Sequence, residues 1–89
     1  MVYITEIHLS GGTGHEHISK VRWLDPNTQK SGTNSREEMV DWILNKNGEA
    51  WVKGKPKDAR VGVVNAHPPY LRTFADNQYT NNLLDLPRF

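Results

Sequence analysis

A single helix is marked in this 89-residue sequence, and every other apolar segment is short. The helix signal begins at Ser35 and Glu38, which have capping-box spacing. In that arrangement a serine hydroxyl and a glutamate carboxylate each satisfy a free backbone N–H. Residues 39–43 supply apolar side chains at the three- and four-residue spacing of one helix face. Gly48 stands where a left-handed C-terminal cap is expected, so the sequence predicts one amphipathic helix that ends before it.

The remaining apolar segments alternate with polar residues, which is typical of strands with one buried face. Clusters of Gly, Pro, Asp and Asn separate these segments and predict turns. Strands are predicted at residues 2–9, 17–24, 49–53, 59–66 and 70–74. Within the first strand, alternation places Tyr3, Thr5, Ile7 and Leu9 on one face. The polar run that ends at Asn34 is predicted to be a mobile connection.

These elements follow the order β-β-α-β-β with a further strand near the C-terminus. They predict an α+β fold in which an antiparallel sheet of four to five short strands carries one amphipathic helix on a face. A chain of 89 residues has too little interior for two domains, so residues 1–89 are expected to form one. The predicted core consists of Ile4, Ile7, Val21, Trp23, Val40, Ile43, Leu44, Val52, Val61, Val63, Leu71 and Leu83.

The C-terminal stretch, residues 70–89, is rich in large apolar side chains. An undocked segment of this kind would expose large apolar side chains to water, so the stretch is expected to dock on the core. Asp76-Asn77 predicts a turn, because both side chains bond the local backbone and tolerate positive φ. Residues 83–86 fit a single helical turn, with Asn81 or Asn82 as its cap and the following proline at its end.

The same stretch carries a resemblance to a known family. Its closing motif comprises Tyr70-Leu71-Arg72-Thr73, Ala75-Asp76, Asn81-Asn82-Leu83-Leu84 and Leu86-Pro87. With a start like Tyr3-Ile4-x-x-Ile7 and a middle like Ser35-x-x-x-Met39-Val40-x-Trp42-Ile43, the chain resembles a small bacterial and phage family, domain-of-unknown-function family 3892. Asn77 departs from that pattern, in which a glycine is expected. Asparagine tolerates positive φ next best, so the turn is still expected. The resemblance implies no activity, substrate or cofactor.

The composition excludes several classes of protein. Without cysteine the chain has no disulfide, thiolate nucleophile or thiolate metal ligand. No serine stands in a recognisable nucleophile motif, so we expect neither an enzyme nor a cofactor. There is no charged-then-apolar leader, and no apolar run nears the ~18–20 residues that span a bilayer, so we expect a soluble, cytoplasmic protein with no membrane partner. Eleven Lys and Arg against ten Asp and Glu argue against a nucleic-acid coat and an acidic mimic.

Two local motifs suggest ligand sites. His15 and His17 would point to one face if the second strand already ran through His15, and His8 or His67 could add a third zinc ligand. The alternative, which two histidines alone favour, is an exposed loop beside glycines. The glycines at 11–14 follow a strand and resemble a phosphate loop, but a phosphate loop leads into a helix and here a strand is predicted to follow. We therefore reject a phosphate loop.

A basic cluster surrounds the third and fourth predicted strands. Its members are Lys46, Lys53, Lys55, Lys57 and Arg60, opposed by Glu49 and Asp58. With Trp51 among them, they could bind nucleic acid, with phosphates on the cations and a base on the ring. The alternative, which we favour from sequence, is a solvated hairpin whose lysines protect an edge while Trp51 packs under the helix.

A second candidate constellation lies in the C-terminal stretch. It consists of Arg72 with Asp76 or Asp85, together with Asn81 and Asn82. Arginine could hold a carboxylate or phosphate with two hydrogen bonds, and paired asparagines could recognise an amide or a base edge. The alternative, again favoured, is that Arg72 pairs with a nearby carboxylate while the asparagines cap and turn the tail.

From these observations we expect a non-catalytic binding or accessory module that acts through a surface, with an unknown protein partner. The alternative is a nucleic-acid-binding domain that uses the basic hairpin Lys53–Arg60 with Arg72. Affinity that falls steeply with salt would favour the alternative, whereas an exposed apolar patch or a dimer would favour the first. A metal-dependent hydrolase at the histidines ranks third and would require tight zinc binding with proton release.

Overall fold

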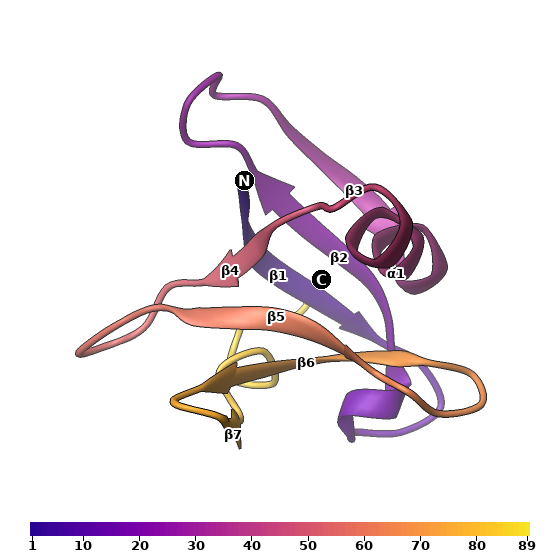
Figure 1. Cartoon of the computed structure of the whole chain (residues 1–89). Coiled ribbons are helices and arrows are strands. Elements are labelled where there is room, and N and C mark those ends of the chain that lie inside the picture. Colours follow the sequence, from indigo (N-terminus) through magenta and orange to yellow (C-terminus); the bar gives the residue numbers. More distant parts are fainter.

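Seven strands form one sheet in the computed structural model, which describes residues 1–89, and their order across the sheet is β3-β2-β1-β4-β5-β6-β7. The strands are β1 Val2–Leu9, β2 Ile18–Leu24, β3 Ser31–Ser35, β4 Ala50–Val52, β5 Ala59–Val64, β6 Tyr70–Ala75 and β7 Gln78–Thr80. The helix α1, Arg36–Asn45, lies near β3, and a short 3-10 turn η1, His15–His17, precedes β2 (Figure 1). The protein is thus a small, compact α+β domain, as predicted.

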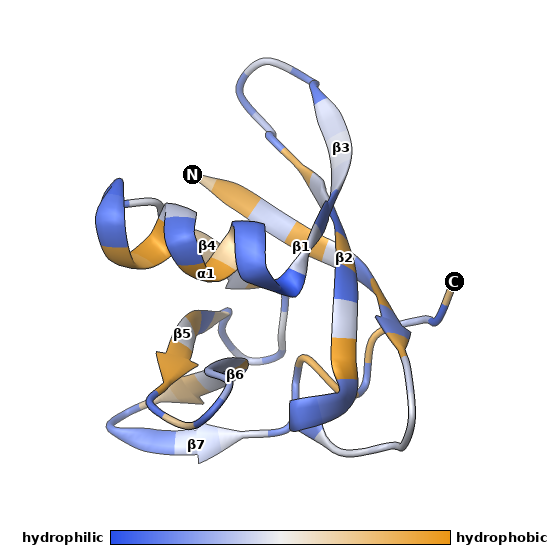
Figure 2. Ribbon diagram, turned by 90° about the vertical axis from the view of Figure 1, so that its right-hand side faces the viewer, coloured by the Kyte–Doolittle hydropathy of each residue, from blue (hydrophilic) through white to orange (hydrophobic).

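The sheet is larger than the sequence predicted, and it is not purely antiparallel. β1 and β4 pair in parallel, through Val2 with Ala50 and Tyr3 with Trp51. β3 was predicted to be a mobile connection, but it pairs with β2 over five residues. Both overlooked strands, β3 and β7, contain almost no hydrophobic residues (Figure 2). An edge strand of this kind is held by its backbone ladder, so it has no apolar pattern to reveal it.

β1 does not alternate as predicted. Ile4 and Ile7 are both buried although they lie three positions apart, with exposed fractions of 2% and 0%. The pairing of β1 with β2 shifts by one residue between Ile4 and Glu6. An extra residue at such a bulge reverses the faces of everything that follows it. Thr5 is therefore exposed, and the predicted face that joined Tyr3 and Thr5 to Ile7 was wrong.

The helix begins as predicted and ends differently. The backbone N–H of Glu38 donates a hydrogen bond to the Ser35 hydroxyl at 3.1 Å, and the backbone N–H of Ser35 donates to the Glu38 carboxylate at 2.9 Å. At the other end Asn47, not Gly48, adopts the left-handed conformation, with φ of 54°. Gly48 is needed for space, because a Cβ there would overlap the ring of Trp42. Its amide donates to the carbonyl of Trp42 at 2.9 Å and closes the helix.

Replacing Ser35 with alanine is expected to lower the free energy of unfolding by about 1 kcal/mol, because the amide of Glu38 then loses its partner. Chemical denaturation followed by circular dichroism measures this loss. Ser10→Ala is the matched control, since Ser10 lies in an exposed loop and its side chain makes no hydrogen bond. Equal stability of the two variants would contradict a stabilising role for the capping box.

The hydrophobic core is one cluster between the sheet, α1 and the C-terminal segment. Of the predicted core residues, eight are buried and Trp23, Ile43 and Val63 pack partly buried against them, whereas Leu44 is 59% exposed. Leu44 follows the apolar stripe of α1 but faces solvent. The buried residues of the cluster are Val2, Ile4, Ile7, Ile18, Val21, Met39, Val40, Ala50, Val52, Val61, Leu71 and Leu83.

The C-terminal segment packs on this core. Leu83 is fully buried, and the amide of Asp85 donates to the carbonyl of Asn81 at 3.1 Å in a single helical turn. Beyond this turn the chain runs beside β1, where Ile7 donates to Pro87 and Phe89 donates to Ile7, each at 3.0 Å. One edge of β1 is thus shared between β4 in its first half and the C-terminal residues in its second.

Candidate binding face

A row of five side chains crosses the outer face of the sheet. Tyr3 is paired with Trp51, Trp51 with Arg60, Arg60 with Phe74, and Phe74 with Tyr79. Side chains at paired positions of neighbouring strands project to the same side. The core side chains Val52, Ala59, Val61 and Thr73 occupy the alternate positions and face inward. We call these five residues, from strands β1, β4, β5, β6 and β7, the outer row.

The rings of the outer row are accessible to solvent. Tyr79 is 60% exposed and Phe74 is 37% exposed, while Tyr3 and Trp51 are half-buried. Gly62, next to Phe74 across the β5–β6 ladder, makes room for its ring, since a Cβ there would lie 2.5 Å from Phe74 Cε1. Neighbouring exposed aromatic rings on a sheet form an apolar patch, which makes this face a candidate contact surface.

Cationic side chains lie over three of these rings. The guanidinium carbon of Arg60 is 5.4 Å from the centre of the Trp51 ring, and that of Arg72 is 4.7 Å from the centre of Tyr79. The ammonium of Lys53 lies 5.0 Å from the centre of Tyr3. Each distance falls within the ~6 Å of a cation–π contact. The outer row therefore offers flat apolar surfaces and positive charge side by side.

Hydrogen bonds hold the first two rings in place. The indole N–H of Trp51 donates to Glu49 Oε2 at 2.7 Å, and the hydroxyl of Tyr3 donates to Asp58 Oδ2 at 2.8 Å. That hydrogen bond to the Asp58 carboxylate is the main reason why the pKa of Tyr3 is raised. Asp58 also accepts the amide of Gly54 at 3.2 Å, which fixes the β4–β5 loop. These hydrogen bonds fix the orientation of the Trp51 and Tyr3 rings.

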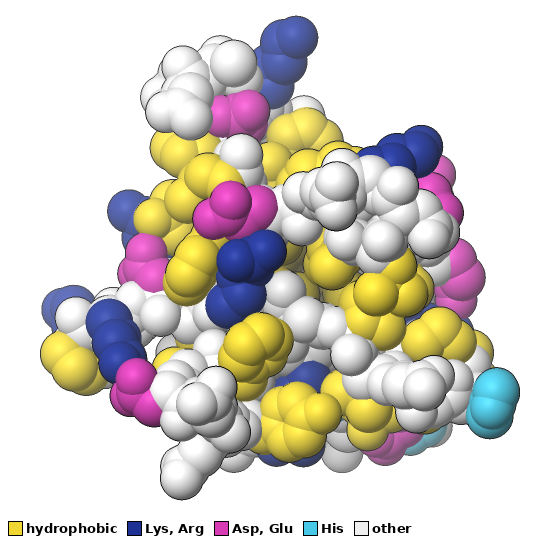
Figure 3. Space-filling model, viewed as in Figure 1, with side chains coloured by type: hydrophobic (Ala, Val, Ile, Leu, Met, Phe, Trp, Pro, Cys, Tyr) yellow, Lys and Arg dark blue, Asp and Glu magenta, His cyan; other side chains and the backbone are white.

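Two open grooves flank Phe74 on this face. The larger, of about 670 Å³, includes Trp51, Arg60 and Ile43 of α1 among its lining residues. The smaller, of about 300 Å³, includes Tyr79. Figure 3 shows hydrophobic side chains with Lys and Arg side chains between them over β4, β5 and β6 on the face turned to the viewer. Trp51, expected to pack under the helix, instead lines the open groove.

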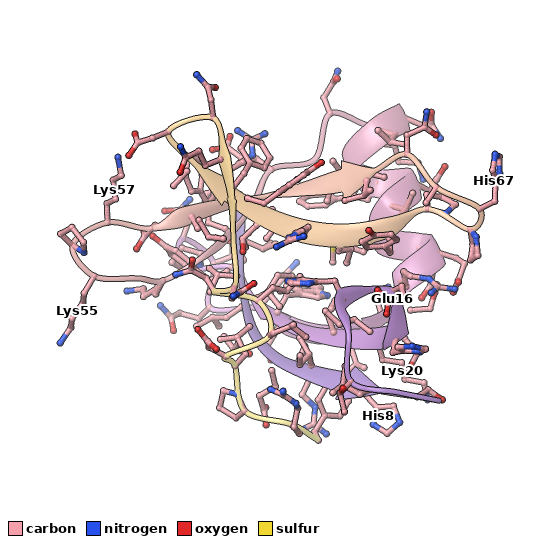
Figure 4. The ribbon with its side chains drawn as sticks, turned by 90° about the horizontal axis from the view of Figure 1, so that it is seen from below. His8, Glu16, Lys20, Lys55, Lys57 and His67 are labelled. Atoms are coloured by element: carbon pink, nitrogen blue, oxygen red, sulfur yellow. The ribbon has the colours of Figure 1, made fainter.

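The structure brings together part of the predicted binding surface. Lys53, Arg60 and Arg72 lie over rings of the outer row. Lys57 Nζ is 2.6 Å from Asp76 Oδ1, so this ion pair connects the β4–β5 loop to the β6–β7 turn. Lys55 extends from the same loop into solvent (Figure 4).

Arg72 does not pair with a carboxylate. Its Nη2 atom donates to Asn81 Oδ1 at 3.4 Å, and Asp76 is bound to Lys57 instead. Asn82 lies beside Gly54 of the β4–β5 loop, where a Cβ on the glycine would be 3.0 Å from Asn82 Nδ2. Both residues of the Asp76-Asn77 turn have positive φ, 53° and 64°, which confirms the predicted turn. Arg72 thus keeps donor groups that no carboxylate occupies.

Sequence reasoning missed Tyr3, Phe74 and Tyr79 as site residues. Alternation of side chains along a strand indicates which face of that strand each of these residues occupies. It does not indicate which strands lie side by side in the sheet. Only the parallel pairing of β1 with β4 and the hairpin register of β6 with β7 align them. The detectable signal was the Asp76-Asn77 turn, which fixes that hairpin register.

The histidines do not converge. His15 and His17 lie in η1, not in a strand, so the condition under which both would point to one face is not met. His17 Nε2 is 3.3 Å from Glu16 Oε1, and His8 Nδ1 contacts the backbone oxygen of Phe89. His67 lies in an exposed loop at the end of the sheet opposite to the loop that carries Lys57 (Figure 4). No three His, Asp or Glu side chains are placed to hold a metal ion.

His15 is buried, and its pKa lies below the ordinary value of a histidine. Only 7% of the residue is exposed, and its Nε2 atom has no hydrogen-bond partner. Burial lowers the pKa of His15, the positive charge of Arg72 lowers it further, and Glu16 opposes both effects. The lowered pKa favours the neutral form of this buried imidazole.

Acidification is expected to weaken the fold through His15. In the unfolded chain its pKa is about 6.5, so below that pH the unfolded state binds a proton that the folded state does not. The free energy of unfolding should fall as the pH drops below about 6.5, towards the lowered pKa of the folded state. Denaturant melts at several pH values measure the slope. The slope should be smaller in His15→Gln, and an unchanged slope would contradict the assignment.

No helix of the protein is long and apolar enough to cross a membrane. A comparison with curated proteins and with solved structures finds no match. A family model does match, over residues 3–87, and it confirms the resemblance seen in the sequence. Nearly the whole chain, including the outer row, lies within the match. The chain therefore belongs to the family described as protein of unknown function (DUF3892).

Proposed function

We propose that this protein is a non-catalytic binding module that holds single-stranded nucleic acid on the outer row. The observation that carries the proposal is the row of aromatic rings in register on β4, β6 and β7, namely Trp51, Phe74 and Tyr79. Arg60 of the intervening strand β5 lies over the first ring, and Arg72 lies over the last. Unpaired bases stack on such rings whatever their sequence, and the cations follow the phosphates. A cytoplasmic location is part of this proposal.

The geometry favours a single strand over a duplex. The rings lie on a sheet face flanked by open grooves, and the one helix, α1, has acidic residues in its first turn, which DNA phosphates would repel. Bases inside a duplex are stacked on one another and cannot reach a ring on a protein surface, whereas single-stranded bases can. The near-even net charge of +1 further favours local contacts over a long electrostatic tract.

The experiment is a titration of labelled 12-nucleotide DNA and RNA with the protein at several salt concentrations, followed by fluorescence anisotropy. If the three cations over the rings, Lys53, Arg60 and Arg72, each neutralise one phosphate, the log–log slope of affinity against salt should be roughly −2, since each contact contributes about −0.7. Single strands should bind more tightly than the same sequence as a duplex. Affinity independent of salt, or preference for the duplex, would overturn the proposal.

A charge-matched pair of variants sharpens the test. Arg60→Ala should reduce the salt slope by about 0.7, because it removes one phosphate contact beside Trp51. Lys20→Ala is the control, since Lys20 lies on β2 and outside the outer row. Two-dimensional amide NMR spectra should place the shifts on β4, β5, β6 and β7. If no oligonucleotide produces shifts, the protein partner expected from sequence becomes the better proposal for the same face.

A further inference from the structure

A second hollow, separate from the outer row, lies between α1 and the ends of β1 and β2. Its volume is about 570 Å³. Val2 and Met39, 8% and 4% exposed, form part of its apolar lining, so the hollow opens directly onto the core. None of its lining residues belongs to the outer row, and it is independent of the proposed nucleic-acid binding.

Two tryptophans line this hollow. The indole N–H of Trp23 donates to Asn34 Oδ1 at 2.6 Å, which fixes that ring against β3. Trp42 of α1 is packed against Gly48, where no side chain separates the ring from the backbone. Rings that are fixed by such contacts offer rigid surfaces to a ligand, so binding costs little conformational entropy of the side chains.

The polar lining is predominantly acidic. Asp25, Glu38 and Asp41 contribute three carboxylates, against the single ammonium of Lys46. Backbone amides hold two of these carboxylates in the charged form: the amide of Asn27 lowers the pKa of Asp25, and that of Ser35 lowers the pKa of Glu38. Lys46 Nζ is 3.8 Å from Asp41 Oδ2, and both side chains are largely exposed, so this ion pair is weak and easily displaced.

We propose that this hollow binds a small organic cation with an apolar body, an alkylguanidinium or alkylammonium compound. The faces of the indole rings attract the cationic group through cation–π interaction. The same rings bury the apolar body of the ligand by hydrophobic contact. The carboxylates supply the opposite charge at the mouth. They do not gather into a group of three that could hold a metal ion, and they would repel a phosphate or a carboxylate ligand.

The test uses butylguanidinium as the probe and the indole N–H signals as the readout. The chain has three tryptophans, so Trp51 on the outer row serves as an internal control for Trp23 and Trp42. Saturable shifts of the Trp23 and Trp42 signals, with Trp51 unmoved, are expected. n-Pentanol, an uncharged molecule of similar size, should bind much more weakly. Equal affinity for the alcohol, or shifts confined to Trp51, would overturn the proposal.

A matched pair of variants checks the charge. Asp41→Asn should weaken butylguanidinium binding about two- to fivefold, which is what one exposed ion pair is worth. Asp41 is exposed on α1 and its substitution should leave the fold intact. Asp85→Asn, an equally exposed change in the C-terminal segment, should leave the affinity unchanged. If both variants bind like the wild type, the carboxylate has no role and the proposal fails.

Discussion

Replacing Leu83 with alanine is expected to lower the free energy of unfolding by about 2–5 kcal/mol, since this side chain is fully buried and its removal leaves a cavity. Small domains have only about 5–15 kcal/mol in total, so the variant should be partly unfolded at physiological temperature or close to it. The residue belongs to the C-terminal segment, and its loss should therefore reveal how much the segment contributes to the fold. Urea denaturation followed by tryptophan fluorescence measures the change.

Leu44→Ala provides a matched control for this measurement. It makes the same chemical change at a leucine that is 59% exposed on α1. Surface substitutions of this kind usually stay within about 0.5 kcal/mol of the wild type. A loss at Leu83 no larger than the loss at Leu44 would show that the C-terminal segment contributes little to the stability of the core.

Replacing Tyr79 with alanine is expected to weaken binding of single-stranded oligonucleotides about 5- to 150-fold. This range corresponds to the 1–3 kcal/mol that one base stacked on an aromatic ring contributes. Tyr79 is 60% exposed and lies at the end of the outer row, so its removal should leave the free energy of unfolding nearly unchanged. Fluorescence anisotropy gives the affinity, and a thermal melt confirms that the variant is folded.

Tyr79→Phe separates the ring from the hydroxyl. It keeps the aromatic surface under Arg72, so it should bind oligonucleotides almost as the wild type does. Weak binding by both variants would assign the effect to the hydroxyl, and normal binding by both would remove Tyr79 from the site. In either case stacking at this position would be wrong, while the rest of the outer row could still be tested through Phe74.

The parts of the fold that the sequence predicted are those with a local cause. Ser35 and Glu38 mark the helix start because their hydrogen bonds lie within one turn. The Asp76-Asn77 turn follows from the positive φ that both residues tolerate. β3 was missed because Ser31–Ser35 contains no large apolar residue, and its place depends on a ladder with β2.

The outer row could not be predicted as a candidate binding face, because it depends on pairings between residues far apart in the sequence. Trp51 and Tyr3 lie side by side only because β4 pairs in parallel with β1. In the sequence these two strands are separated by β2, β3 and α1. The bulge after Ile4 then places Tyr3 and Ile7 on opposite faces of the sheet. Neither feature leaves a pattern in nearby residues. The cations Lys53 and Arg60 were identified, since a charge cluster is visible in the sequence itself.

The shared edge of β1 has a consequence for how the chain folds. His8 and Phe89 contact each other across 81 positions of sequence, and Ile7 is bracketed by Pro87 and Phe89. Contacts between such remote residues slow folding, because a large loop must close before they form. During synthesis the second half of β1 emerges about 80 residues before its backbone partner at residues 87–89. A ribosome-bound chain therefore carries an open strand edge until residues 87–89 have emerged, and that edge is where a nascent chain of this protein is most exposed to mispairing.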